Sequence, residues 1–355
     1  MNMEILAFNE ARLAKLAAQL GAAPAVFRLF NQNGTFTVPF HCMADILLVG
    51  GGASGGITYS NGTVGGAGAG EVAVLHSREF AAGTVLNVTV ASGGAGQTRN
   101  TVGQTQGVAG GTTRMFTASG FDLRALGGQP GGVGTGFQNG GAGGTGGSAF
   151  SVGADGALHY AGGPGGTASS ASFGVAGGGA VNIMGWSDPA TRLVGGSFNT
   201  GTGGAGGAGV GGQGGDKNTA TSASFSPGGG SGGPGDNALS AAASAGVNAI
   251  GVRTQASVSS LATYATWCLD YFGGGGYTNV APGPGGGSSG DTVANLKASG
   301  IFGGMGGAFN GSTTVITLPQ AGIGGGGAAL HITSTTGWFS GRGGDGLAVL
   351  MLRRL

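Results

Sequence analysis

One stretch of the sequence matches a pattern that binds dinucleotide cofactors in many enzymes. Gly50, Gly52 and Gly55 spell G-x-G-x-x-G after an apolar run, and Glu71 follows roughly twenty residues later. In that pattern a helix must follow the glycines, because the cofactor's pyrophosphate binds at the N-terminus of the helix. Residues 56–62 are instead β-branched and interrupted by glycine. We therefore expect no cofactor at this motif, and the sequence predicts none elsewhere.

Phosphate and metal sites find equally little support. A Walker A loop needs a lysine directly after a glycine, and none of the three lysines follows one. Residues 211–216 fit one calcium repeat of the form G-G-x-G-x-D, but such sites need adjacent repeats, and no tandem copy follows. The histidines are widely separated and lack metal-binding spacing; they are His41, His76, His159 and His331. We expect a turn at 211–216 and no metal site.

Residues suited to covalent or acid–base catalysis are also scattered. Serine is common, but no serine stands in a motif with a plausible triad order around it. A glycosidase needs two carboxylates close in space, and the thirteen acidic residues are spread from Glu4 to Asp345 without a favoured pair. The sequence therefore predicts a protein that is not an enzyme.

Aromatic residues are the strongest candidates for contact with a partner. Side chains that combine a ring with a polar group are enriched at binding surfaces. The candidates lie in glycine-poor stretches or near the C-terminus and are Trp186, Tyr264, Trp267, Tyr271, Trp338 and Phe339. The alternative is that these aromatics form a small core that caps a glycine-rich body.

Composition limits the elements that position these residues. Glycine makes up 89 of 355 residues, which disfavours ordinary helices and half-buried sheets because glycine loses the most entropy on folding and adds no side chain to a core. Ten prolines are too few for collagen. A hydrophobic content of 40% and a net charge of +1 argue against disorder, nucleic-acid binding and anionic membranes. No signal peptide or membrane span is evident, and the two cysteines are expected to be free buried thiols.

The non-glycine stretches indicate β-strands near both ends. Residues 33–39, 45–49, 71–75 and 80–90 are β-prone, and Leu86, Val88 and Val90 alternate as one buried face. Residues 346–352 form a continuous apolar run, typical of a strand buried on both faces. The first and last strands are therefore expected to share a small sheet or sandwich.

Glycine tracts lie between these strands, at residues 140–147, 203–215, 228–235, 273–276, 283–287 and 324–327. Many have the form G-G-X. A polyproline-II-like helix has three residues per turn and no internal hydrogen bonds, so its backbone groups must bond to neighbours. With two of three positions lacking a Cβ, such helices can approach closely. We predict a bundle of polyglycine-II helices joined by loops such as 180–200 and 236–272, in which a valine at Gly207 or Gly325 would be strongly destabilising.

The N-terminal residues 3–20 predict the only clear helix. Its seam has a three–four spacing and consists of Leu6, Asn9, Leu13, Leu16 and Leu20. Two heptads are marginal alone, so this helix needs a partner, either copies of itself or another protein. The alternative is that it packs on its own domain.

The ordered set of strand and glycine segments resembles the glycine-rich domain of tailed-bacteriophage fibre and receptor-binding proteins. The matching segments are residues 34–39, 46–52, 70–74, 82–90 and 343–349, and the resemblance covers roughly residues 33 to 352. One departure is the sequence after the first strand, where residues 40–43 read Phe-His-Cys-Met instead of an apolar turn containing glycine.

The resemblance implies a mainly β and irregular fold, with short strands plus polyglycine-II helices in residues 31–355. The N-terminal helix lies outside the resemblance, and we expect residues 1–30 to serve for attachment or trimerisation. The resemblance implies a virion tail fibre or adhesin that is made in the host cytoplasm and assembles as a homotrimer. Its expected partners are other virion proteins, through the N-terminal helix, and a host surface protein or polysaccharide. A purely structural head fibre, capsid decoration or tail-tip scaffold is the main alternative, and a polysaccharide-cleaving fibre is the last.

Overall fold

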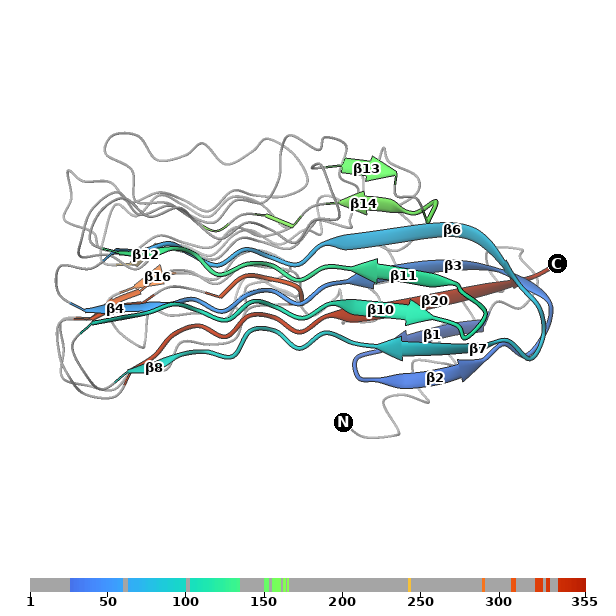
Figure 1. Cartoon of the computed structure of the whole chain (residues 1–355), viewed down its shortest axis with the longest axis horizontal. Helices are drawn as coiled ribbons and strands as arrows, with labels where there is room; N and C mark the ends of the chain where they lie inside the picture. Colours follow the sequence, from blue (N-terminus) through green and yellow to red (C-terminus); the bar gives the residue numbers. More distant parts are fainter. Residues whose placement is uncertain are drawn as a thin grey trace.

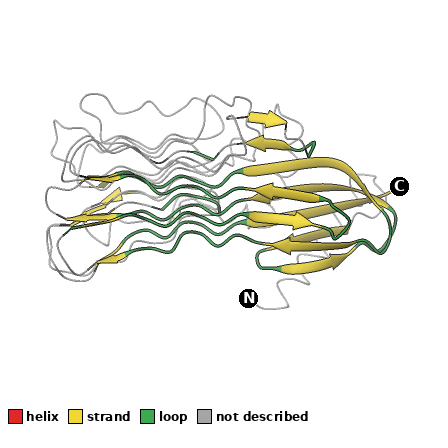
Figure 2. Ribbon diagram, in the orientation of Figure 1, coloured by secondary structure: helices red, strands yellow, loops and turns green. Residues whose placement is uncertain are grey.

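The computed structural model describes the strands and the segments between them in thirteen stretches. These are residues 26–59, 63–99, 103–134, 150–152, 155–160, 162–163, 165, 242–243, 289–290, 308–310, 323–327, 330–332 and 338–355. Every regular element in them is a β-strand, and the sheets are open (Figure 2). The predicted helix at 3–20 lies outside these residues, as do the predicted glycine tracts other than 324–327.

Two antiparallel sheets form a sandwich at one end of the molecule (Figure 1). The first sheet has the order β1 (Val26–Phe30), β20 (Leu347–Arg354), β3 (Cys42–Val49), β6 (Val72–Phe80), β14 (Leu158–Tyr160) and β13 (Phe150–Val152). The second has the order β11 (Asp122–Ala125), β10 (Thr113–Phe116), β7 (Val85–Thr89) and β2 (Gly34–Thr37). The expectation that the opening and closing strands share a sheet or sandwich is confirmed, since β20 pairs with β3, which contains the predicted strand 45–49. The predicted strand 33–39 corresponds to β2 in the second sheet. Strand β1, which was not predicted, also pairs with β20, so the first sheet begins at Val26, five residues before the expected domain boundary.

The core of the sandwich consists of side chains that alternate along the strands. Leu86 and Val88 of β7 are buried, as their period-two spacing predicts, and Val90 packs partly buried at the edge. They meet Met115 of β10 and Leu123 of β11 in one apolar cluster with the inner residues of the first sheet. Burial of such side chains is the main stabilising contribution to a sandwich of this kind.

The central strands of the first sheet are buried on both faces. Ile46 and Leu48 of β3 belong to the core cluster, while Leu47 and Val49, on the opposite face, are also inaccessible to solvent. Strand β20 follows the same rule along most of its length, although Met351 is only half-buried. The continuous apolar runs of these two strands are the sequence pattern that such burial requires.

Turns close the sandwich at the end farthest from the glycine segments. Gly83 and Gly120 have φ values of +82° and +105° in the turns after β6 and β10, a region that glycine adopts most easily. Phe40 and His41 form the bend before β3, so the sequence that departs from the resemblance makes a turn without glycine. Cys42 follows as a buried free thiol, as predicted.

Beyond the sandwich, the strands continue into glycine-rich segments that run side by side (Figures 1 and 2). We call these segments the glycine bundle; they comprise residues 50–56, 65–71, 91–97, 106–112, 126–132, 162–163, 165, 323–327 and 340–346. At the far end of the bundle lie short strands, namely β4 (Ile57–Tyr59), β5 (Thr63–Val64), β8 (Thr98–Arg99), β9 (Gln104–Thr105), β12 (Val133–Gly134) and β19 (Trp338–Phe339). We call this the distal end.

Backbone hydrogen bonds join the bundle with a period of three residues. Successive N–H groups of the central segment, residues 50–56, donate in turn to three neighbours, in the pairs Gly50 to Glu71, Gly51 to Gly111, Gly52 to Gly344, Ala53 to Gly68, Ser54 to Val108 and Gly55 to Gly341. These N···O distances are 2.8 to 3.1 Å. A β-ladder lies in one plane and pairs a strand with neighbours on two sides, whereas these partners change at every residue and return at the third.

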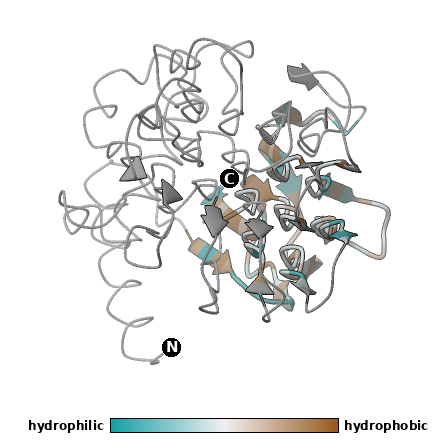
Figure 3. Cartoon of the chain, turned by 90° about the vertical axis from the view of Figure 1, so that its left-hand side faces the viewer, coloured by the Kyte–Doolittle hydropathy of each residue, from teal (hydrophilic) through white to brown (hydrophobic). Residues whose placement is uncertain are grey.

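Three further segments donate to the same central segment. Its carbonyl oxygens accept from the N–H groups of Gly128 at Gly51, Gly94 at Gly52 and Gly327 at Ala53. The central segment is therefore bonded to neighbours all around it. Figure 3, which looks from the distal end, shows the described segments grouped around one another instead of in a single layer.

The absence of side chains is what permits this arrangement. A Cβ placed on Gly52 would collide with the carbonyl group of Gly325, and one on Gly70 would collide with that of Gly50. Corresponding collisions with backbone atoms arise at glycines throughout the bundle. The core of the bundle is thus backbone packed against backbone.

The remaining strands form one sheet with β4 and β9, which we call the distal sheet. Its order is β15 (Ala242–Ala243), β16 (Ser289–Gly290), β17 (Ala308–Asn310), β18 (Leu330–Ile332), β4 and β9. The pairs from β16 to β4 are parallel. Strand β15 falls within residues 236–272, which were predicted as a loop; the rest of that stretch lies outside the described residues.

Candidate functional site

The distal end carries the one predicted aromatic pair that the structure describes. Trp338 and Phe339 form β19, which pairs antiparallel with β8 so that Trp338 lies opposite Arg99 and Phe339 opposite Thr98. Phe339 is 40% exposed, although most large apolar residues with described burial are covered. An exposed aromatic residue on a paired strand is well placed to contact another molecule.

Ser340 anchors this aromatic pair to the bundle. Its hydroxyl donates to the carbonyl oxygen of Gly55 at 2.6 Å and accepts from the N–H of Gln97 at 2.9 Å. The N–H of Ser340 also donates to the carbonyl oxygen of Gln97 at 2.9 Å. Because Ser340 is 2% exposed, these bonds are shielded from water and hold β19 against two neighbouring segments.

Other polar side chains cross-link the bundle near its distal end. The hydroxyl of Ser54 accepts from the N–H of Val108 at 2.8 Å. The side-chain amides of Gln104 and Gln106 donate to the carbonyl oxygens of Gly134 and Gly131. The few side chains in these segments therefore supplement the backbone bonds and fix the base on which the distal strands lie.

The other predicted site residues lie outside the described residues. They are the aromatic candidates Trp186, Tyr264, Trp267 and Tyr271 and the attachment seam Leu6, Asn9, Leu13, Leu16 and Leu20. The structure therefore places Trp338 and Phe339 together at the distal end and leaves the contacts of the remaining candidates as predictions.

The glycine motif at 50–55 has a structural explanation that differs from cofactor binding. Gly50, Gly52 and Gly55 are buried within the central segment, and the chain continues into strand β4 where the dinucleotide pattern requires a helix. Glu71, the acidic residue of the pattern, lies in a buried cluster with His159. The motif residues thus serve the bundle.

Glu71, His159 and Asp155 form a carboxylate–imidazole–carboxylate cluster in which Glu71 and His159 are buried and Asp155 reaches the surface. Oε1 of Glu71 lies 2.9 Å from Nδ1 of His159, and an oxygen of Asp155 lies 3.2 Å from Nε2. The hydrogen bond to Glu71 raises the pKa of His159, and it outweighs the opposing effect of burial, with a smaller contribution from Asp155. Oε2 of Glu71 accepts from the N–H of Leu126 at 2.8 Å, so the cluster ties three chain segments together.

A second polar cluster stabilises a β-bulge between β3 and β6. The register shifts between Ala44 and Ile46, and Ser77 adopts a φ of +53°, which is uncommon for a residue other than glycine. Oδ1 of Asp45 accepts from the N–H of Ser77 at 2.8 Å, and Arg353 lies 2.9 Å from Oδ2. Burial raises the pKa of Asp45, but hydrogen bonds from His76 and Ser77 and the charge of Arg353 lower it by more.

Sequence reasoning missed both clusters because their members are far apart in the chain. Glu71 and His159 are separated by 88 positions, and Asp45 and Arg353 by 308. Neither spacing forms a local motif. Only the strand pairing of β14 with β6, and of β20 with β3, brings these groups together.

Among the described residues, no group of three or more histidine, cysteine, aspartate or glutamate side chains has an arrangement suited to a metal ion. The same part of the chain holds no helix with the length and hydropathy of a membrane span.

Fold and distal site together define a class of protein: a glycine-rich β-sandwich whose strands extend into a backbone-bonded bundle and present short strands at the far end. The family model for the glycine-rich domain matches residues 31–252, more than half of the chain. The chain belongs to this glycine-rich domain family. A comparison with curated proteins finds no match.

Proposed function

We propose that this chain is a phage virion protein, a tail fibre or receptor-binding adhesin that contacts the host surface through its distal end. The main supporting observation is that the two ends of the molecule differ. Strands β3, β7 and β11 leave the sandwich, cross the glycine bundle and end in β4, β8 and β12 at one distal end, where the exposed Phe339 also lies. A rigid scaffold that displays connecting segments at one end lowers the entropic cost of binding.

The glycine bundle is the spacer in this proposal, and we propose that its segments are polyglycine-II helices. The three-residue period of the hydrogen bonds agrees with three residues per turn. At about 3.1 Å per residue, a seven-residue segment would separate sandwich and distal end by about 20 Å. Because the lateral bonds replace a side-chain core, such a spacer is stiff although it is rich in glycine.

Attachment is assigned to the opposite end. Val26 of β1 lies opposite Leu352 of β20, on the sandwich side, so the segment that precedes Val26 joins the molecule away from the distal end. We propose that residues 3–20 bind other virion proteins or form a homotrimer there. The proposed function requires no catalysis, and both polar clusters have structural roles that account for their residues.

Adsorption of particles that carry variants of the full chain tests the proposal. Phe339→Ala should reduce the rate of adsorption by about tenfold if Phe339 is a main contact. Val85→Ala is the matched control, because Val85 is 47% exposed but lies on the sandwich. Equal adsorption of all three particles would count against a receptor contact at β19.

Location in the particle separates the adhesin from the structural alternative. Gold particles directed to a tag after Leu355 should label the tail tip or fibres. Label on the head would instead favour a head fibre or capsid decoration without its own receptor.

A further inference from the structure

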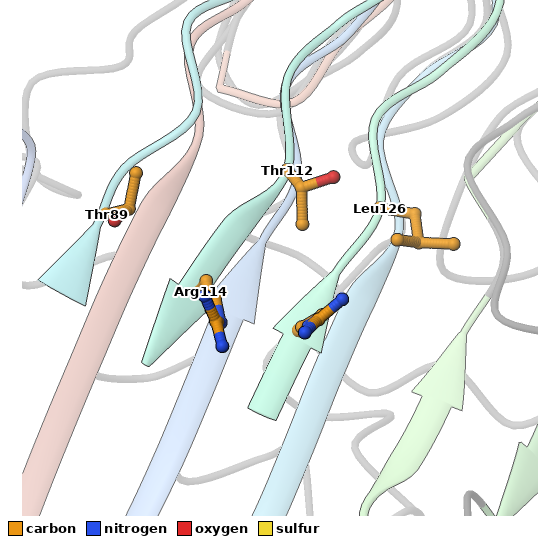
Figure 4. Close-up of a pocket in the computed structure, with 5 residues that line it drawn as sticks. Thr89, Thr112, Arg114 and Leu126 are labelled. Atoms are coloured by element: carbon orange, nitrogen blue, oxygen red, sulfur yellow. The ribbon is translucent and has the colours of Figure 1, made fainter. Parts of the chain in front are cut away.

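A pocket opens on the outer face of the second sheet, where its strands pass into the glycine bundle (Figure 4). It has a volume of about 300 Å³ and is lined by Thr89 of β7, Thr112 and Arg114 beside or within β10, and Arg124 and Leu126 beside or within β11. That volume lies at the lower end of the range for small-molecule sites.

Strand register places the lining residues in two rows. Arg114 lies directly opposite Thr89 on one side and Arg124 on the other. Thr112 lies two residues before Arg114, and Leu126 lies two residues after Arg124. Because side chains alternate along a strand, both lie on the same face as the arginines, next to the bundle. The two rows bring a pair of cations, a pair of hydroxyl-bearing side chains and one apolar side chain around a single hollow.

The two arginines are held side by side by one carboxylate. Nε and Nη2 of Arg114 donate to the two oxygens of Asp122 at 2.7 and 3.0 Å. Nη2 of Arg124 donates to the same carboxylate at 2.6 Å. The Arg114 guanidinium also lies 4.1 Å from the centre of the Phe116 ring, which limits its movement.

The charges in this group do not cancel. Hydrogen bonds from Arg114 and Arg124 lower the pKa of Asp122 to about 2, so Asp122 is ionised at neutral pH and supplies one negative charge against two positive ones. The Asp122 carboxylate takes the Nε and Nη2 donors of both guanidiniums and offsets one of their two charges. The remaining N–H donors and the excess positive charge suit an oxyanion from the pocket.

We propose that this pocket binds the oxyanion, a carboxylate or a phosphate, of a small ligand such as an acidic sugar residue. Arg114 and Arg124 bind the oxyanion, the hydroxyls of Thr89 and Thr112 bond to neighbouring polar groups of the ligand, and Leu126 contacts its apolar edge. The site is distinct from the distal end, and its existence does not depend on the proposed virion function.

Calorimetric titration of the full chain with glucuronate, glucose 6-phosphate and glucose tests the proposal. Either anion, or both, should bind, while the neutral sugar should not. Arg124→Gln should weaken binding by about tenfold or more, because it removes a charged donor. Added salt should also weaken it, since the guanidiniums are partly exposed.

A matched variant controls for general effects of losing an arginine. Arg354 also lies over an aromatic ring, that of Phe40 at 4.7 Å, but it is outside the pocket, so Arg354→Gln should bind the anions as the wild type does. Binding of glucuronate alone would assign a carboxylate, and binding of glucose 6-phosphate alone would assign a phosphate. Failure of both anions to bind, or equal loss in the two variants, would overturn the proposal.

Discussion

The sandwich and the glycine bundle bury the same strands in two different ways. In the sandwich, residues of β3 and β7 alternate, and side chains such as Ile46 and Leu86 fill the space between the sheets. Past Val49 the same chain bonds to a new neighbour at each residue, and backbone carbonyls occupy the space that side chains would need. The chain therefore changes from a core of side chains to a core of backbone between one residue, Val49, and the next.

Thr113 marks the place where the two kinds of core meet. Its buried hydroxyl donates to the carbonyl oxygen of Val49 at 2.6 Å and accepts from the N–H of Ala91 at 3.1 Å. Val49 ends β3, and Ala91 begins a segment of the bundle. A side chain thus adds to the backbone hydrogen bonds at the junction, such as that from the N–H of Gly346 to the carbonyl oxygen of Ala91.

The comparison predicts that adding a methyl group harms the bundle far more than the sandwich. Gly52→Ala should destabilise the protein by more than about 3 kcal/mol, or prevent folding, because the new Cβ would press on the backbone of Gly325. Gly34→Ala in β2 is the control: there the Cβ would lie 3.5 Å from Cδ1 of Phe30, an ordinary contact. Urea unfolding and the yield of soluble protein measure both.

Gly34→Ala should leave stability unchanged or raise it by up to about 1 kcal/mol, since alanine restricts the unfolded chain. If Gly52→Ala unfolds at the same urea concentration as the wild type, the close packing of backbone against backbone at the central segment would be contradicted.

Truncating a buried side chain should destabilise the sandwich, because its core consists of side chains. Leu86→Ala should cost about 2–5 kcal/mol, because Leu86 is fully buried in the sandwich core and its truncation leaves a cavity. Val85→Ala on the same strand should change stability by less than about 0.5 kcal/mol, since Val85 is exposed. Equal losses in the two variants would show that β7 does not separate an inner from an outer face as described.

Strand patterns made much of the sandwich predictable. The alternation of Leu86 and Val88 predicted a buried face, and the unbroken apolar run at the C-terminus predicted a strand buried on both faces. The order of strands in the sheets was not predictable, because β20 pairs with β3 across more than 290 positions and no local signal specifies such a partner.

Of the predicted glycine tracts, 324–327 lies in the described bundle, and the others lie outside the described residues. Sequence reasoning singled out the longest G-G-X tracts, yet the described bundle also uses short segments such as 91–97, in which only three of seven residues are glycine. Several of these segments directly follow or precede a strand of the sandwich, as 50–56 follows β3 and 126–132 follows β11. Position next to a strand is therefore a signal for bundle segments that tract length alone misses.

Of the predicted site residues, Trp338 and Phe339 fall within the described part of the chain, and they were singled out because aromatic residues are conspicuous among so many glycines. Arg114 and Arg124 escaped it, although a hairpin signal was present: Ser119 and Gly120 lie midway between them and form part of the turn that places them opposite each other. Their shared carboxylate and the pocket beside them depend on this register.

The smallest predicted effect concerns pH and the cluster that joins β14 to the edge of the bundle. The pKa of His159 is raised in the folded protein above its usual value near 6.5, chiefly by Glu71. A raised folded pKa stabilises the protein below the unfolded pKa, and this contribution is lost as the pH rises through the folded value. Stability measured by urea unfolding between about pH 6 and 9 should therefore fall with rising pH through this group.

His159→Gln should flatten this part of the profile, because glutamine can still donate a hydrogen bond but does not titrate in the range. Asp155→Asn should flatten it less, since Asp155 contributes less to the shift than Glu71 does. Each pKa unit corresponds to about 1.4 kcal/mol, so the effect is smaller than that of either core substitution. An unchanged pH profile in His159→Gln would mean that the cluster joins the two regions by hydrogen bonds alone, without the charge on His159.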